Sequence, residues 1–223
     1  NIIMKIAILG SGGREHALAV SISKSSKIEK IYCIPGNAGT SEIATNINLD
    51  INDFDNLYNF LNENKIDFII VGPEKPLVEG IVDYLEQNNI KVFGPNKFAA
   101  QLEGSKIFTK KLCENYNIPT AKFGIFSEVK EAKLFLDKCN YPIVVKADGL
   151  AAGKGVYISE NLGEAMNAVN EIFNGKFGIA NQLLIEEFLE GEEMSFFIIS
   201  DGKNYKQFGT AQDHKRVFEG DKG

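Results

Sequence analysis

Short apolar runs alternate with amphipathic segments through about the first 95 residues, and this alternation constrains the fold more than any other feature. The apolar runs occupy residues 4–9, 28–34, 67–71 and 90–95, and each reads as a strand. The segments between them place hydrophobic residues at helical spacing, as at Phe54, Leu57 and Leu61. Strands alternating with helices predict an α/β fold whose N-terminal domain is a doubly wound parallel sheet.

Three loops rich in glycine and proline follow the ends of these strands. Their sequences are GSGGREH (residues 10–16), PGNAGT (35–40) and GPEKP (72–76). The carboxyl ends of parallel strands meet at one edge of a sheet, where a doubly wound fold binds its ligands. We therefore expect the three loops to line one crevice.

The loop GSGGREH resembles a dinucleotide-binding fingerprint but departs from it at the informative positions. Gly10 and Gly12 fit the pattern G-x-G-x-x-G, whereas Glu15 stands at the third glycine. The second strand also ends at Ile34 without the acidic residue that would hold a ribose. A glycine-rich turn into a helix can still bind one phosphate through backbone N–H groups, with Arg14 adding positive charge. A tight turn with surface charges is the alternative.

The pattern changes after the fourth apolar run. A helix carrying Ile107, Phe108 and Leu112 leads to a strand near residues 122–126, a second helix and two strands around a glycine-rich loop. Another helix and two more strands follow, the last of them turned at Asp201-Gly202. A sheet with helices on one side is an α+β arrangement. We expect residues 1–102 to form the N-terminal domain and residues 103–223 to belong to a second, incomplete domain.

The stretch KADGLAAGKGV (residues 146–156) places two lysines among glycines. It is no Walker A loop, because three residues instead of four separate Gly149 from Gly153, and Lys154 precedes a glycine. A glycine loop between two strands can fold over a polyphosphate, since bare backbone approaches phosphate oxygens closely. A disordered surface hairpin is the equal alternative.

Two charged segments follow in the second half of the chain. IEEFLEGEE (residues 185–193) fits an acidic surface patch, or a linker in which Glu186 and the backbone near Leu189 contact an adenine while Glu193 accepts from ribose hydroxyls. AQDHKR (residues 211–216) groups an aspartate, a histidine and two cations, and a charged tail is its simplest interpretation.

The composition excludes several classes of protein. The net charge of −6 argues against a general binder of nucleic acids or membrane surfaces, because such proteins present basic surfaces. No apolar stretch reaches the roughly 18–20 residues that a membrane-spanning helix needs. Cys33, Cys113 and Cys139 are far apart and lack a CxxC spacing, which predicts free thiols in a reducing cytoplasm and no zinc site.

Nine motifs, taken in order, resemble the glycinamide ribonucleotide synthetase family (phosphoribosylamine–glycine ligases), ATP-grasp enzymes of purine biosynthesis. They are GSGGREHAL, PGNAGT, VGPEKPLVEG, FGP, QLEGSKIFTK, IPTA, VVKADGLAAGKGV, IEEFLEGEE and QDHKR. Each motif alone is weak, but all of them in sequence over the whole chain make a specific match. The resemblance implies an N-terminal α/β domain followed by part of an α+β ATP-grasp domain.

The resemblance also implies roles for individual residues. The loops of the first domain would bind phosphoribosylamine through Gly12, Gly13, Arg14, Asn37, Gly39, Thr40, Pro73 and Glu74. ATP would contact Lys106, Lys146, Gly149, Gly153, Lys154, Gly155, Val156, Glu186, Glu187, Phe188, Leu189 and Glu193. In this assignment residues 149–156 form a mobile lid over the phosphates. The catalytic group, on the glycine and phosphate side, would comprise Asp213, His214, Lys215 and Arg216.

The reaction implied by the resemblance has two steps. ATP phosphorylates the carboxylate of glycine, and the amine of 5-phosphoribosylamine attacks the glycyl phosphate to give glycinamide ribonucleotide, ADP and phosphate. Such a transfer needs no protein nucleophile, because the enzyme accelerates it by positioning the substrates and stabilising charge. Family members are about twice as long as this chain, so ligands of Mg²⁺ or Mn²⁺ are expected beyond residue 223 and no metal ligand is assigned.

Two other functions fit parts of the sequence. Another ATP-grasp carboxylate–amine ligase would share the ATP half, and a non-catalytic nucleotide-binding fragment would fit the lack of metal ligands. The three loops of the first domain favour phosphoribosylamine as the substrate. We expect a cytoplasmic enzyme that acts on small molecules, has no nucleic-acid or membrane partner, and is a monomer or a weak dimer.

Overall fold

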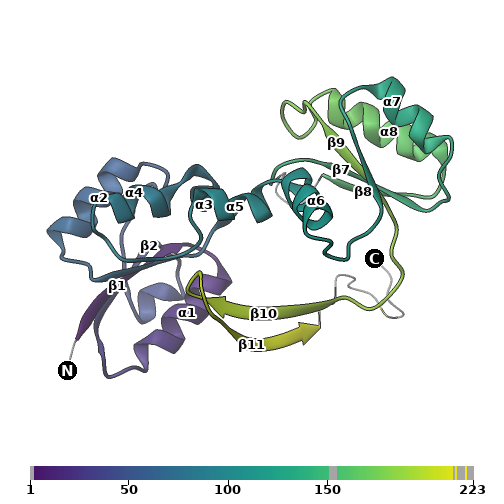
Figure 1. Cartoon of the computed structure of the whole chain (residues 1–223). Coiled ribbons are helices and arrows are strands. Elements are labelled where there is room, and N and C mark those ends of the chain that lie inside the picture. The colour runs from purple at the N-terminus through teal and green to yellow at the C-terminus, as the bar shows by residue number, and fades with distance from the viewer. Residues whose placement is uncertain (1–2, 151–154, 213, 215–218, 220–223) are drawn as a thin grey trace.

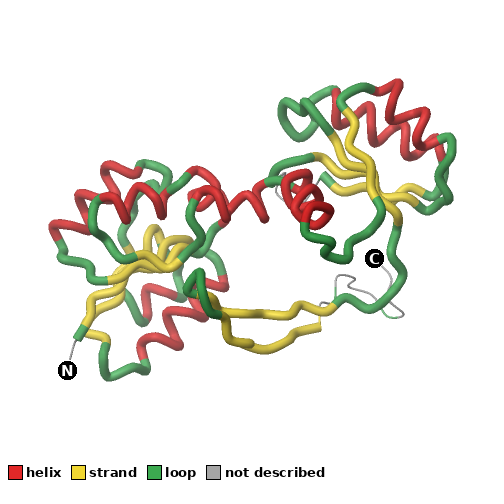
Figure 2. The backbone as a smooth tube through the Cα atoms, viewed as in Figure 1, coloured by secondary structure: helices red, strands yellow, loops and turns green. Residues whose placement is uncertain are grey.

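The computed structural model describes residues 3–150, 155–212, 214 and 219, which form two larger sheets, a hairpin and the helices around them (Figure 1). A five-stranded sheet occupies the N-terminal part, and a four-stranded sheet occupies the part that follows. Figure 2 shows helices flanking both sheets. The predicted fold class, a parallel α/β domain followed by an α+β arrangement, is confirmed.

All five strands of the first sheet are parallel, in the order β3-β2-β1-β4-β5. They are β1 (Met4–Gly10), β2 (Ile28–Pro35), β3 (Thr45–Asn46), β4 (Phe68–Val71) and β5 (Val92–Phe93). The chain leaves β1 toward β2 on one side and later returns to β4 on the other. The loops after β1 and β4 therefore flank the crevice at the carboxyl edge of the sheet.

Helices cover both faces of this sheet because its strands carry apolar side chains in both directions. Ala7 and Leu9 of β1 pack in the core that includes α2 (Phe54–Glu63) and α4 (Ile81–Gln87). Ile6 and Ile8, at the alternating positions, pack toward α1 (Gly13–Ser23). This burial on two faces explains why the strands read as continuous apolar runs.

The helical pattern around residues 78–85 is divided in the structure by a glycine. The chain forms α3 (Glu74–Glu79) and α4 as separate helices, because Gly80 between them has φ = 100°, in the left-handed region. The sequence pattern does not predict α5 (Lys97–Gly104), whose start is capped by the side chain of Asn96. α5 packs against α3.

Four strands form the second sheet, in the order β6-β9-β7-β8, and all neighbouring pairs are antiparallel. They are β6 (Phe123–Phe126), β7 (Ile143–Ala147), β8 (Val156–Ser159) and β9 (Leu183–Glu187). One face packs against α7 (Val129–Leu136) and α8 (Leu162–Phe173) through a core that includes Val145 and Ile185.

The opposite face of the second sheet carries polar side chains. Lys146 of β7 and Glu186 of β9 follow Val145 and Ile185 directly, so they point away from the α7 and α8 core. On this side α6 (Lys106–Asn115) contacts β9. The alternation of a strand thus divides the sheet into a structural face and a face with charged groups.

The chain continues into a hairpin formed by β10 (Met194–Ser200) and β11 (Tyr205–Gln212). The turn predicted at Asp201-Gly202 is confirmed, with Gly202 at φ = 88°. The Asp201 carboxylate accepts hydrogen bonds from the backbone amides of Lys203 and Asn204, at 2.9 and 2.7 Å. The sequence pattern does not predict β11. Large apolar side chains of the hairpin, among them Phe196 and Phe208, are exposed.

Candidate functional site

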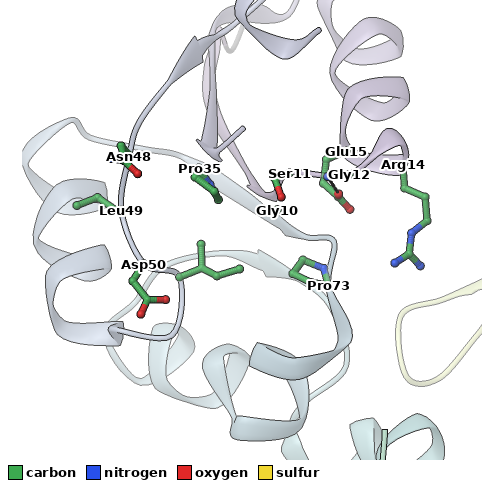
Figure 3. Close-up of a pocket in the computed structure, with 11 residues that line it drawn as sticks. Gly10, Ser11, Gly12, Arg14, Glu15, Pro35, Asn48, Leu49, Asp50 and Pro73 are labelled. Atoms are coloured by element: carbon green, nitrogen blue, oxygen red, sulfur yellow. Dashed lines mark hydrogen bonds between the residues drawn. The ribbon is translucent and has the colours of Figure 1, made fainter. Parts of the chain in front are cut away.

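A pocket of about 560 Å³ lies at the carboxyl edge of the first sheet (Figure 3). All three predicted loops line it, through Gly10, Ser11, Gly12, Arg14, Glu15, Pro35 and Pro73. Residues 48–51 complete its wall. The prediction that the three loops share one crevice is confirmed.

The glycines around the first loop make room for a buried glutamate. Glu15 is only 4% exposed, and its Oε2 accepts a hydrogen bond of 2.6 Å from the Gly12 amide at the start of α1. A Cβ atom at Gly12 or at Gly72 would overlap this carboxylate. Gly10 has φ = 125°, which residues with side chains rarely adopt. The loop is therefore shaped around Glu15, the residue at the third glycine of the dinucleotide pattern.

Gly13 and Arg14 lie on the open side of the same loop. In the described chain, apart from the adjoining residues and the nearby backbone of α1, no atom lies within 4 Å of a Cβ placed at Gly13. The Arg14 guanidinium donates a hydrogen bond to Glu74 Oε1 at 3.0 Å, and this contact raises the pKa of Arg14. A backbone hydrogen bond, supported by Arg14, lowers the pKa of Glu74. The structure thus brings together two predicted substrate residues from different loops.

Side-chain hydrogen bonds hold the second loop against the first. The Asn37 amide group donates to two carbonyl oxygens of the first loop, at 2.9 and 3.2 Å, and its Oδ1 accepts from the Thr40 backbone at 3.0 Å. Thr40 is fully buried. Gly39 leaves space for the ring of His16, which a Cβ would overlap. These predicted substrate residues shape the loops, and their contact with a substrate stays a prediction.

A second pocket, of about 530 Å³, lies on the charged face of the second sheet. Its polar lining includes Lys106, Lys110, Lys146 and Glu186. Its apolar lining includes Leu102, Leu184 and Leu189. Lysines beside apolar side chains suit a nucleotide, because phosphates need positive charge and a base needs apolar contact.

Lys106 stands at the start of α6 and reaches the glycine-rich loop. Its Nζ donates to the carbonyl oxygen of Gly149 at 2.7 Å. Burial lowers the pKa of Lys106, and the charge of Lys146 acts in the same direction against the opposing effect of Asp148. Asp148 fixes the loop to the helix, since its carboxylate accepts from the Ser105 hydroxyl at 3.0 Å and from a helix amide at 3.2 Å.

A buried carboxylate, Glu186, lies between two lysines in this pocket. It is 6% exposed, its Oε2 lies 2.6 Å from Nζ of Lys110, and its Oε1 contacts Nζ of Lys146. Lys110 ends the motif QLEGSKIFTK but receives no predicted role from the sequence. Its position four residues after Lys106 places both on one face of α6, and that spacing is the signal that could have found it.

The other residues predicted to contact ATP differ in their position, contacts and exposure. Gly149 and Leu189 line the second pocket. Glu187 ties β9 to the start of β6, because its carboxylate accepts a hydrogen bond of 2.9 Å from the Lys122 amide. The remaining described members of the group differ in exposure, with a buried Gly155, a partly buried Phe188, and exposed Val156 and Glu193.

Several predicted residues fall outside the described chain, namely Gly153, Lys154, Asp213, Lys215 and Arg216. His214 is described and exposed. Among the described residues, no three His, Cys, Asp or Glu side chains gather as a metal site requires. Within the same ranges, no helix combines the length and hydrophobicity needed to cross a membrane.

Two family models match successive parts of the chain. Residues 4–103 match the N domain of phosphoribosylglycinamide synthetase. Residues 104–223 match the ATP-grasp (A) domain of the same enzyme family.

Curated proteins and a solved structure resemble the chain over nearly its whole length. A phosphoribosylamine–glycine ligase of Mesorhizobium japonicum is 53% identical over 99% of the chain, and one of Caldanaerobacter subterraneus is 46% identical over 99%. The chain spans about half the length of these relatives, 52% and 53%. The crystal structure of phosphoribosylamine–glycine ligase from Thermotoga maritima superposes with a TM-score of 0.82 at 32% identity, over 98% of this chain and 52% of that one.

Proposed function

The chain belongs to the phosphoribosylglycinamide synthetase family, as its motifs predict, and from this premise we propose that it joins glycine to 5-phosphoribosylamine with ATP. The products would be glycinamide ribonucleotide, ADP and phosphate, in purine biosynthesis. One observation carries the proposal: a glycine-rich pocket on the first sheet accompanies a lysine-lined pocket on the second, in a chain whose two parts match two domains of one family.

The reaction consists of a phosphoryl transfer followed by an acyl transfer. ATP donates its terminal phosphoryl group to the glycine carboxylate, the amine of phosphoribosylamine attacks the carbonyl carbon, and phosphate leaves. Neither step needs a covalent bond to the protein, so the chain contributes positioning and charge. Mg²⁺ or Mn²⁺ would neutralise phosphate charge when bound, but the described residues offer no ligand cluster for it.

We assign the nucleotide to the second pocket. Lys106 and Lys146 would contact the phosphates, and the described glycines of the loop, Gly149 and Gly155, would let the backbone approach them closely; residues 151–154 lie outside the described chain. The segment from Glu186 to Leu189 would contact the adenine, and Glu193 would accept hydrogen bonds from the ribose. Lys146 contacts Glu186, so it would have to turn from that carboxylate toward the phosphates.

We assign phosphoribosylamine to the first pocket. The Gly12 amide is already bonded to Glu15, whose charge would repel a phosphate placed directly on that amide. The phosphate would therefore lie farther along the first turn, at the Gly13 and Arg14 amides and the Arg14 guanidinium. Residues 213–216 would act on the glycine side.

The proposal extends to the setting of the enzyme. Its partners would be small molecules, and it would work in the cytoplasm as a monomer or weak dimer. Free thiols at Cys33, Cys113 and Cys139 support a reducing compartment.

Phosphate release by the full-length protein tests the proposed reaction. Phosphate should appear only with ATP, glycine and phosphoribosylamine together, because the acyl transfer that releases phosphate requires the amine of phosphoribosylamine. Lys146→Met should weaken ATP binding by about 1.5–3 kcal/mol through the loss of a charge-assisted contact, whereas Lys111→Met, at an exposed position of α6, should not. Release without phosphoribosylamine would indicate another ATP-grasp ligase, and ATP binding without release would indicate a non-catalytic nucleotide binder.

A further inference from the structure

We infer that Lys110 is a positioning residue for base recognition: it holds the Glu186 carboxylate in the orientation in which Glu186 can select the base of the nucleotide. The inference rests on the nucleotide site proposed above. Lys110 is 9% exposed, lies on α6 and lines the second pocket.

The ammonium group of Lys110 lies beside three oxygen atoms, with hydrogen bonds to two of them and an ion pair with the third. Its Nζ lies 2.6 Å from Glu186 Oε2, 2.7 Å from Thr120 Oγ1 and 3.3 Å from the carbonyl oxygen of Ala121. Two of the three N–H donors of the lysine are used by Thr120 and Ala121, and the Glu186 carboxylate balances its charge. The ring of Phe123, with its centroid 5.4 Å away, adds a favourable face for the charge. Lys110 is therefore committed to the protein and is not available to a phosphate.

The two lysines that contact Glu186 differ in their freedom to move. The Lys146 side chain is 25% exposed, whereas that of Lys110 is 11% exposed. Lys146 can leave Glu186 for the phosphates, and Lys110 then remains as the counter-charge. One carboxylate oxygen stays fixed by Lys110, and the oxygen released by Lys146 becomes an acceptor for the base.

A fixed carboxylate selects a base by hydrogen-bond chemistry. A carboxylate only accepts hydrogen bonds, so it favours adenine, which has an exocyclic amino group, over hypoxanthine, which has a carbonyl oxygen at that place. Without Lys110, Glu186 would keep Lys146 as its remaining cation and lose its fixed position. The expected consequence is a loss of base selectivity together with weaker nucleotide binding.

Calorimetric titration of the full-length protein with ADP and IDP tests this role. The wild type should bind ADP about 10-fold more tightly than IDP, and Lys110→Met should reduce this ratio to about 2-fold or less. Lys110→Arg retains a cation and should preserve much of the ratio. Lys111→Met, on an exposed neighbour, should leave it unchanged. In a Glu186→Gln background, Lys110→Met should change the ratio no further, because Lys110 acts through Glu186.

Two results would overturn the role of Lys110. One is an unchanged ratio of ADP to IDP affinity in Lys110→Met. The other is that Lys110→Met lowers this ratio as much in the Glu186→Gln background as it does in the wild type. If Lys110→Met does not fold, Thr120→Val removes one acceptor of Lys110 at an exposed position and should lower the ratio about 2-fold. A wild type that binds neither nucleotide would overturn the proposed nucleotide site and this inference with it.

Discussion

Lys106 lies in surroundings that disfavour its positive charge. Burial lowers its pKa from the ordinary lysine value, and the nearby Lys146 adds to the effect. Bound phosphates would favour the ammonium form and raise the pKa again. At a pH between the free and bound values, nucleotide binding must therefore be accompanied by proton uptake.

We predict this uptake at pH values between the lowered pKa of Lys106 and the ordinary lysine pKa. Calorimetric titration with ATP over a series of pH values, in buffers that differ in ionisation enthalpy, should show uptake of up to about one proton in this window, and the uptake should fall below it. Lys106→Arg should abolish it, because a guanidinium stays protonated throughout this range. The same uptake in Lys106→Arg would mean that another group carries the proton.

At the scale of one element, two glycines near α1 differ in their surroundings: Gly72, after β4, is crowded by Glu15 of α1, whereas Gly13, at the start of α1, is open. Gly72→Ala places a methyl group against the buried Glu15 and should destabilise the protein by about 1–3 kcal/mol. Gly13→Ala adds the same group at the first residue of α1, where space is open, and should be neutral or stabilise by up to about 1 kcal/mol. Urea unfolding measures the free energy of unfolding of both variants. An equal loss of stability in the two would show that the contact with Glu15 does not cause the difference between them.

At the scale of the whole molecule, the sheets have separate hydrophobic cores. Leu57 belongs to the core of the first sheet and Ile172 to that of the second, and both side chains are fully buried. No described residue is shared between these two cores. Local stability should therefore depend on each core separately.

Paired core truncations test this independence. Leu57→Ala and Ile172→Ala should each cost about 2–5 kcal/mol. Hydrogen exchange should accelerate in β1 and β4 for the first variant, and in β7 and β9 for the second. Accelerated exchange in both sheets from either variant would instead indicate one cooperative unit.

The amino-acid sequence by itself determined the elements whose residues repeat at a regular spacing. The strands β1, β2 and β4 are recognisable because burial on both faces makes them continuous apolar runs. α2 is recognisable from Leu57 and Leu61, one helical turn apart. The ordered motifs determined the family, and the geometry of parallel strands determined which loops share a pocket.

Only the tertiary structure decided which side chains meet across long distances in the chain. The contacts of Lys110 with Glu186 and of Arg14 with Glu74 join segments that are brought together by the sheets and their flanking helices. The break at Gly80 and the burial of Glu15 depend likewise on the packing around them. Hydrophobic spacing reports which face of an element is buried, but the partner of a polar side chain is set by how the elements assemble.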